Sequence, residues 1–219
     1  MYRYIFFDLD GTLTDSKEGI FNCVRYALEK MGEPDLQDDV LKHFIGPPLH
    51  DSYIRYCGFS REKALEAVQL FRERYTVIGK FENAPAPGLL DLCRRLRERG
   101  YVLALSSSKP EKMCEQICEK FGFAPLLATI AGSPPSGDDW EKADVIRETM
   151  RRLGLTDADK DSILMVGDRK FDVLGAKECG IDCVGVEFFG YAAPGELTDA
   201  GAAAVVRSAA ELEDFILNH

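Results

Sequence analysis

Residues 4–12 read YIFFDLDGT, and this stretch decides the fold of the chain. It begins with a run of apolar residues, which is the pattern of a strand buried on both faces of a parallel sheet. Such a strand places the residues that follow it at the carboxyl edge of the sheet, where open α/β folds bind their ligands. We therefore expect Asp8 and Asp10 at that edge, with Gly11 allowing the chain to turn away.

Two carboxylates one residue apart repel each other, so Asp8 and Asp10 need an explanation. A divalent cation between them, with a separate chemical task for each, would make the pair tolerable. An acidic turn after a strand explains the same residues without any chemistry. The motif alone does not decide between these interpretations.

The composition is that of an ordinary globular protein: 219 residues, 46% hydrophobic and 29% charged. The formal net charge of −10 argues against nucleic acid or an anionic membrane surface as the main partner, but not against a small anionic substrate. No apolar run has membrane-spanning length. The seven cysteines are scattered without a CxxC pair, so we expect reduced thiols and a cytoplasmic location.

From residue 82 onward, segments with strand and helix patterns alternate. Apolar runs predict strands over 101–105, 126–131, 163–166, 183–186 and 203–206, and helical patterns separate the first four of these from one another. Strand–helix repeats of this kind form right-handed crossovers. The sequence therefore predicts an α/β fold with a doubly wound parallel sheet.

The segment between the first strand and this repeat has helical periodicity and no good strand. Apolar residues share a helical face over 20–31 and again over 64–78, and the segment is too long for a simple crossover. We therefore predict an α/β core of residues 1–15 with 82–219, and a helical insert of residues 16–81. Between the two helical patterns, residues 44–49 form a loop rich in glycine and proline.

A second polar strand end is the run SSSKP at residues 106–110. A serine here can cap the following helix, and a proline suits its first turn. Hydroxyl and backbone N–H groups at a helix N-terminus also bind anions. The serine run leaves both interpretations open.

Lys142 lies in the first turn of a predicted helix, which Asp138 or Asp139 is expected to cap. A cation in that position opposes the helix macrodipole. The placement suggests an anionic partner such as a phosphate, although a lysine that simply extends into solvent is the alternative.

The last polar strand end is GDRKFD at residues 167–172, directly after an apolar strand. Asp168 and Asp172 can face the same way once the helix begins, although helix capping would also explain Asp172. Together with Asp8 and Asp10 they bring four carboxylates toward one point. So much negative charge requires a hard cation, and oxygen ligands alone favour Mg²⁺ over zinc or copper.

In this order, the four strand ends resemble the motifs of the haloacid dehalogenase superfamily of phosphohydrolases. Residues 8–13 match its first motif, Ser107 its second (with Ser106 as a competitor), Lys142 its third and residues 167–172 its fourth. The common Lys-Pro start of the third motif is absent. The chain looks most like members labelled phosphoglycolate-phosphatase-like or 5′-nucleotidase-like. The resemblance implies a Rossmann-like core with an inserted α-helical cap that closes over the substrate.

The resemblance also implies the chemistry, which is hydrolysis of a phosphomonoester through an aspartyl-phosphate. Asp8 would be the nucleophile, and Asp10 would protonate the leaving alkoxide and then deprotonate water. Ser107, Ser108 and Lys142 would bind the phosphoryl oxygens.

Mg²⁺ is the implied cofactor. The implied metal-site residues are Asp8, Asp168, Asp172 and Asp10, the last through its backbone carbonyl. For Asp172, holding a metal-bound water or orienting Lys142 is favoured over direct ligation.

Two alternatives use similar residues. A phosphosugar mutase of the β-phosphoglucomutase type would share all four motifs. A phospho-accepting receiver module would share the acidic pocket, but receivers are shorter and lack a helical insert. We expect a small phosphorylated metabolite as the partner, no nucleic acid or membrane, and a monomer or weak homodimer.

Overall fold

The computed structural model describes residues 1–134 and 140–219, and the chain divides into two compact units. One unit is Met1–Thr14 together with Pro85–His219, and the other is Asp15–Ala84. Within the described ranges, no helix is both long enough and apolar enough to span a membrane. That the smaller unit acts as a cap stays a prediction.

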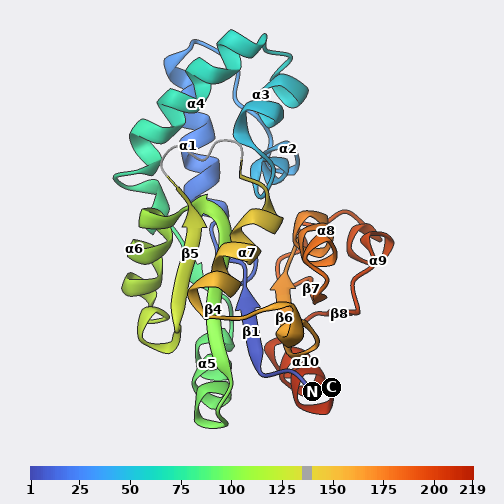
Figure 1. Cartoon of the computed structure of the whole chain (residues 1–219). Coiled ribbons are helices and arrows are strands. Elements are labelled where there is room, and N and C mark those ends of the chain that lie inside the picture. Colours follow the sequence, from blue (N-terminus) through green and yellow to red (C-terminus); the bar gives the residue numbers. More distant parts are fainter. Residues whose placement is uncertain (135–139) are drawn as a thin grey trace. The chain divides into compact units, whose positions relative to one another are not determined.

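The larger unit is built around a six-stranded sheet in the order β5-β4-β1-β6-β7-β8 (Figure 1). All neighbouring strands are parallel. The strands are β1 (Tyr4–Phe7), β4 (Val102–Pro110), β5 (Thr129–Ser133), β6 (Ile163–Gly167), β7 (Asp182–Val186) and β8 (Ala204–Val206). The predicted α/β fold with a doubly wound parallel sheet is therefore confirmed.

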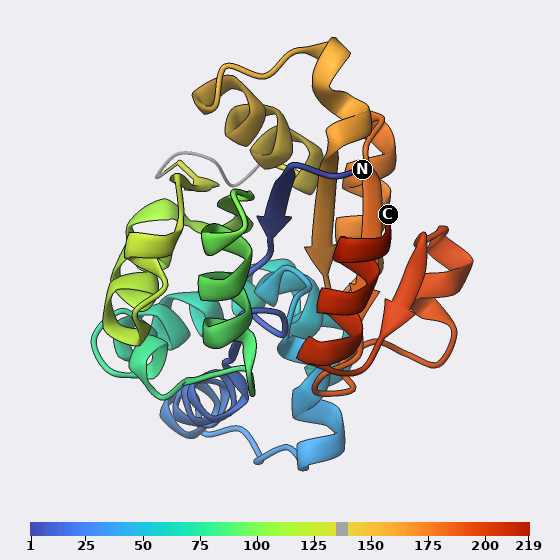
Figure 2. The ribbon, with the colours of Figure 1, turned by 90° about the horizontal axis from the view of Figure 1, so that it is seen from below.

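Helices cover both faces of this sheet (Figure 2). On one face lie α5 (Leu89–Glu98), α6 (Glu111–Phe121) and α10 (Ala209–Asn218), and on the other lie α7 (Lys142–Arg152), α8 (Lys170–Cys179) and α9 (Glu196–Ala200). The larger unit also contains short 3-10 helices at Ala124–Leu126 and Asp157–Ser162. Within β1, Ile5 and Phe7 belong to the first core and Phe6 to the second, and all three are fully buried. This double burial explains why the strand has no polar alternation.

The smaller unit is helical, as its periodicity predicts. Its helices are α1 (Lys17–Lys30), α2 (Asp38–Leu41), α3 (Leu49–Cys57) and α4 (Arg61–Tyr75), with 3-10 helices at Lys42–Phe44 and Gly79–Phe81. The start of α1 approaches the second 3-10 helix so closely that a Cβ on Gly19 would lie 2.0 Å from the carbonyl oxygen of Gly79. The prediction that one apolar helical face extends over 64–78 is wrong for its last residues, because α4 ends at Tyr75 and Ile78 is 53% exposed.

The strand predicted over 126–131 starts later, at Thr129, because Ala124–Leu126 form a 3-10 helix. Two further differences lie at strand ends. The two-residue strands β2 (Thr14–Asp15) and β3 (Ala84–Pro85) form a separate sheet where only connecting segments were expected. The β4 strand continues to Pro110, beyond the apolar run, because the serines keep strand geometry, and the pairing with β5 resumes after a register shift. Both differences lie in polar or proline-containing sequence, where periodicity gives no signal.

Candidate active site

Neighbouring strands at the centre of the sheet end together at its carboxyl edge. Phe7 of β1 pairs with Leu105 of β4 on one side and with Val166 of β6 on the other. Asp8 directly follows β1, and Ser106 follows Leu105 within β4. The Asp8 backbone N–H donates to the Val166 carbonyl at 2.9 Å. The first, second and fourth motifs therefore meet at one edge.

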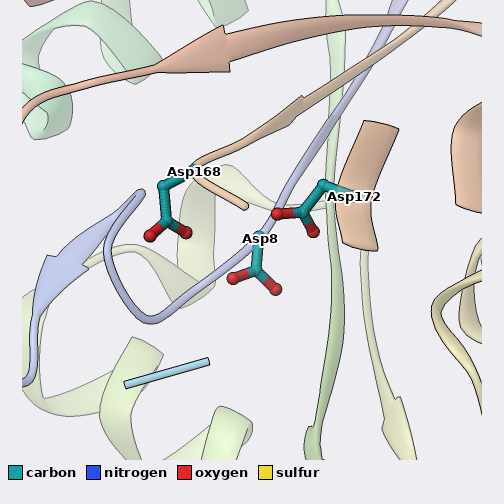
Figure 3. Close-up of side chains that lie close together, drawn as sticks. All are labelled: Asp8, Asp168 and Asp172. Atoms are coloured by element: carbon teal, nitrogen blue, oxygen red, sulfur yellow. The ribbon is translucent and has the colours of Figure 1, made fainter. Parts of the chain in front are cut away.

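Three carboxylates converge there, and we call Asp8, Asp168 and Asp172 the carboxylate cluster. Each offers an oxygen, and these oxygens lie within 4.8 Å of one another. In Figure 3 they point toward one another from the end of β1, the turn after β6 and the start of α8. Asp168 and Asp172 are each 3% exposed.

Lys142 brings the third motif to the same point. Its ammonium donates to Asp8 Oδ1 at 2.5 Å, lies 2.6 Å from Asp172 Oδ1 and donates to the Ser106 carbonyl at 2.8 Å. Its side chain is 6% exposed, so the alternative of a lysine in solvent is wrong. Asp172 therefore forms an ion pair with Lys142, and its role in the site stays a prediction.

The helix that starts at Lys142 is not capped as expected. Its N-cap is Glu141, which forms a reciprocal capping box with Asp144, whose carboxylate accepts from the Glu141 N–H at 3.0 Å. Asp138 and Asp139 lie outside the described residues. The flanking carboxylates compensate for a cation at a helix start.

The electrostatics of the site follow from burial. Burial raises the pKa of Asp8 to about 6, with Lys142 opposing the shift. Burial also raises the pKa of Asp168 well above its ordinary value, and the charges of Asp172 and Asp8 act in the same direction. Burial alone would lower the pKa of Lys142, but Asp172 and Asp8 outweigh it and raise that pKa. One ammonium therefore faces three carboxylates and does not neutralise them.

Glycines make room for the carboxylates. Gly11 has φ +84°, which favours glycine, and a Cβ there would lie 2.2 Å from the Asp168 carboxylate. A Cβ on Gly167 would lie 2.2 Å from the Asp172 carboxylate carbon. Thr12 adds a hydroxyl that donates to Asp168 Oδ1 at 3.4 Å. The glycines of the first and fourth motifs are therefore required by close approach.

The remaining predicted residues lie around this cluster. Asp10 is not part of it, and its Oδ2 forms an ion pair with Lys109. Ser107 is 3% exposed, and its Oγ accepts from the Lys109 N–H at 3.4 Å, whereas Ser108 is exposed. The Ser106 hydroxyl is buried and has no hydrogen-bond partner within the described part of the chain.

The site is also supported by two residues, Lys109 and Glu196, that were not assigned to it from the sequence. The ammonium of Lys109 contacts Asp10, and its position after a buried strand on the same edge was a usable signal. Glu196 accepts from Arg169 Nε at 2.9 Å and from the Lys170 N–H at 3.0 Å, which anchors the start of α8. Nothing in the sequence around Glu196 indicated this role.

The carboxylate cluster fits a divalent cation. Its donors are all oxygens, which hard cations such as Mg²⁺ prefer. Asp168 Oδ2 is buried without a hydrogen-bond partner among the described residues, and burying such an atom is costly unless a ligand satisfies it. Three carboxylates against one ammonium leave negative charge that a cation would neutralise.

Comparison with known proteins agrees with this geometry. The family model of haloacid dehalogenase-like hydrolases matches residues 5–186. A 5′-nucleotidase of Pseudomonas aeruginosa is 40% identical over 198 residues, 90% of this chain and 87% of that protein. Phosphoglycolate phosphatases match at lower identity, 27% for that of Pseudomonas putida.

Two further similarities cover almost the whole chain. The tyrosine-protein kinase PtkA of Mycobacterium tuberculosis is 36% identical over 97% of this chain and 71% of its own length. The crystal structure of a predicted phosphatase from Clostridium acetobutylicum is similar with a TM-score of 0.91 and 38% identity, and the match covers 100% of both chains. The chain therefore belongs to the haloacid dehalogenase-like hydrolases, as an enzyme of the family's phosphatase type.

Proposed function

We propose that the protein is a Mg²⁺-dependent hydrolase of phosphomonoesters that works through an aspartyl-phosphate on Asp8. The observation that supports this most directly is the contact between the Asp8 carboxylate, whose side chain is 13% exposed, and the buried ammonium of Lys142 at the carboxyl edge of the sheet. A carboxylate held against a cation is suited to approach an anionic phosphoryl group, because the ammonium offsets the repulsion.

The proposed reaction has two displacements at phosphorus. An Asp8 oxygen forms a bond to phosphorus while the bond to the ester oxygen breaks, and Asp10 gives that oxygen its proton. Asp10 then takes a proton from water as the water oxygen bonds to phosphorus and the Asp8–phosphorus bond breaks. Lys142 and the second-motif serines, Ser107 and Ser108, bind phosphoryl oxygens. Inorganic phosphate leaves, and both carboxyl groups return to their starting state.

The carboxylate cluster would hold the Mg²⁺ ion, with the carbonyl of Asp10 as a further ligand. When bound, the ion supplies charge neutralisation at the phosphoryl group. Asp172 also pairs with Lys142 and caps α8, since its Oδ2 accepts from the Arg169 N–H at 3.0 Å. Asp172 therefore serves chiefly to orient Lys142.

We propose a small phosphorylated metabolite as the substrate, either a nucleoside monophosphate or a phosphoglycolate-like acid. The names of the relatives at 40% and 27% identity support these two classes. The smaller unit would act as the cap that selects between them, and a cytoplasmic location and a monomer or weak homodimer stay predictions.

The test is Mg²⁺-dependent release of phosphate from p-nitrophenyl phosphate by the parent enzyme and by Asp8→Asn. Asp161→Asn, which removes an exposed carboxylate, is the matched control. We expect Asp8→Asn to lower kcat by about 10⁴-fold or more, the scale found when a covalent nucleophile is removed. Turnover that survives Asp8→Asn would contradict the proposal.

Further measurements identify the substrate class and distinguish a phosphatase from a mutase and from a kinase. A panel of nucleoside monophosphates, phosphoglycolate and sugar phosphates, ranked by kcat/KM, identifies the substrate class. Conversion of a sugar phosphate to its isomer without phosphate release would indicate a mutase. Because one relative is named a tyrosine-protein kinase, transfer from ATP to a tyrosine peptide is measured in parallel.

A further inference from the structure

The two carboxylate oxygens of Asp10 have different surroundings. Oδ2 forms an ion pair with the ammonium of Lys109. Oδ1 is buried and has no hydrogen-bond partner among the residues that the structure describes. The side chain of Asp10 is only 16% exposed, so solvent does not make the two oxygens equivalent.

The surroundings of Lys109 restrict its side chain to a position beside Asp10 Oδ2. It lies near the end of β4, between Ser107 and the start of α6, and its side chain is 10% exposed. Its backbone N–H donates to Ser107 Oγ at 3.4 Å, and its carbonyl accepts from Cys114 Sγ at 3.5 Å. A flexible side chain that is nine-tenths buried has lost most of its rotamer freedom, so its contact with Asp10 is well defined.

We propose that Lys109 is a positioning residue that fixes the rotamer of Asp10 and leaves Oδ1 as the oxygen that exchanges a proton with the substrate. This rests on the acid–base role of Asp10 in the proposed function. An ammonium only donates hydrogen bonds, so it occupies Oδ2 and excludes a proton there. The proton on Oδ1 passes to the ester oxygen as the bond from that oxygen to phosphorus breaks. Oδ1 is then free to accept the proton of water in the second displacement.

The leaving group distinguishes this role from two simpler ones. An alkyl phosphate needs a proton on its leaving oxygen, whereas p-nitrophenolate leaves without one. If Lys109 instead bound the phosphoryl group, its loss would raise KM for every ester. If it only stabilised the fold, its loss would lower activity equally for all esters.

The test measures kcat/KM of Lys109→Met for p-nitrophenyl phosphate and for the best alkyl phosphate of the panel, because kcat/KM reports the step in which the alcohol leaves. We expect a loss of about 100-fold for the alkyl ester and less than about 10-fold for the aryl ester, within the range of general acid catalysis. Lys109→Arg, which keeps a cationic donor, should recover most of the alkyl activity. Lys112→Met removes an exposed lysine of α6 and should change neither ester.

Thermal unfolding monitored by circular dichroism checks that each variant is folded, and Lys109→Gln replaces Lys109→Met in the same measurement if the latter is not. Equal losses for both esters, or a change confined to KM, would overturn the positioning role alone. A parent enzyme without Asp8-dependent turnover would overturn the proposed function, and this inference with it.

Discussion

At the carboxyl edge of the sheet, the buried side chains of Asp168, Asp172 and Lys142 lie close to Asp8, which is partly buried, whereas the ion pairs of Asp15–Ala84 lie nearer the surface. In that smaller unit, Arg25 is 2.7 Å from Asp38 Oδ1, and their side chains are 37% and 64% exposed. At the sheet edge, Lys142 and Asp172 are 6% and 5% exposed. Arg25 also pairs with Asp35, so this surface group carries excess negative charge too, but water solvates its carboxylates, whereas the carboxylates at the sheet edge are largely shielded from water.

This difference separates ion pairs that follow from a charged surface from charges kept for chemistry. An exposed pair gains little, because water solvates both partners almost as well. Buried carboxylates without equal compensation are costly, so a protein retains them where a ligand or a reaction requires them. The comparison predicts that charge changes in the two regions differ in size.

The largest difference is expected when one cation is removed from each region. Lys142→Met leaves buried carboxylates without their ammonium and should lower the free energy of unfolding by about 3–5 kcal/mol. Arg25→Met in the smaller unit is the matched change. Urea unfolding in EDTA measures both, and equal effects would show that burial does not set the energetics here.

Metal removal is the next test. At neutral pH and a Mg²⁺ concentration of 100 times Kd, the parent protein should gain about 2.7 kcal/mol of stability, which EDTA removes. Asp168→Asn should lose this gain, because it alters the donor set of the carboxylate cluster. Asp161→Asn should keep it, and a gain that persists in Asp168→Asn would place the ion elsewhere.

A smaller effect is expected from pH in the metal-free protein. The pKa of Asp8 is raised to about 6, so between its ordinary pKa of 3.8 and 6 the folded state keeps a proton that the unfolded state has lost. Stability should therefore fall as pH rises, by about 1–2 kcal/mol between pH 5 and pH 7. The carboxylates with lowered pKa, such as Glu148 at about 2, are ionised throughout this window. Asp8→Asn should flatten the profile, and an unchanged slope would rule out Asp8 as its source.

The smallest effect is expected on the surface of the smaller unit. Arg25→Met should lower the free energy of unfolding by less than about 1 kcal/mol, and less still in high salt. Chemical denaturation at two salt concentrations checks both. A cost near that of Lys142→Met would remove the contrast between the two regions.

The fold was predictable because β1 and β6 are apolar throughout and lie between two helical layers. Their neighbours were less predictable, since β4 continues through polar serines and the β2–β3 pair has too few residues for any periodicity. The order of strands in the sheet depends on contacts between residues far apart in the sequence, which local patterns do not encode.

The convergence of Asp8, Asp168, Asp172 and Lys142 followed from strand ends meeting at one edge, and the structure brings these residues together. Their roles stay predictions. The ion pair between Asp10 and Lys109 was not predicted, because a long side chain can reach several partners from one backbone position. Glu196 was missed for a similar reason, since it approaches Arg169 from the distant helix α9.

The central place of β1 also bears on biosynthesis. Its partners, Val102 on one side and Ile163 on the other, are translated long after Tyr4 itself. A nascent chain therefore exposes β1 without a partner until residues 102–105 have left the ribosome, and with one open edge until residues 163–166 follow, which leaves apolar strand surface open to aggregation. A translation product that stops before β6 also lacks Asp168 and Asp172, so it cannot form the carboxylate cluster.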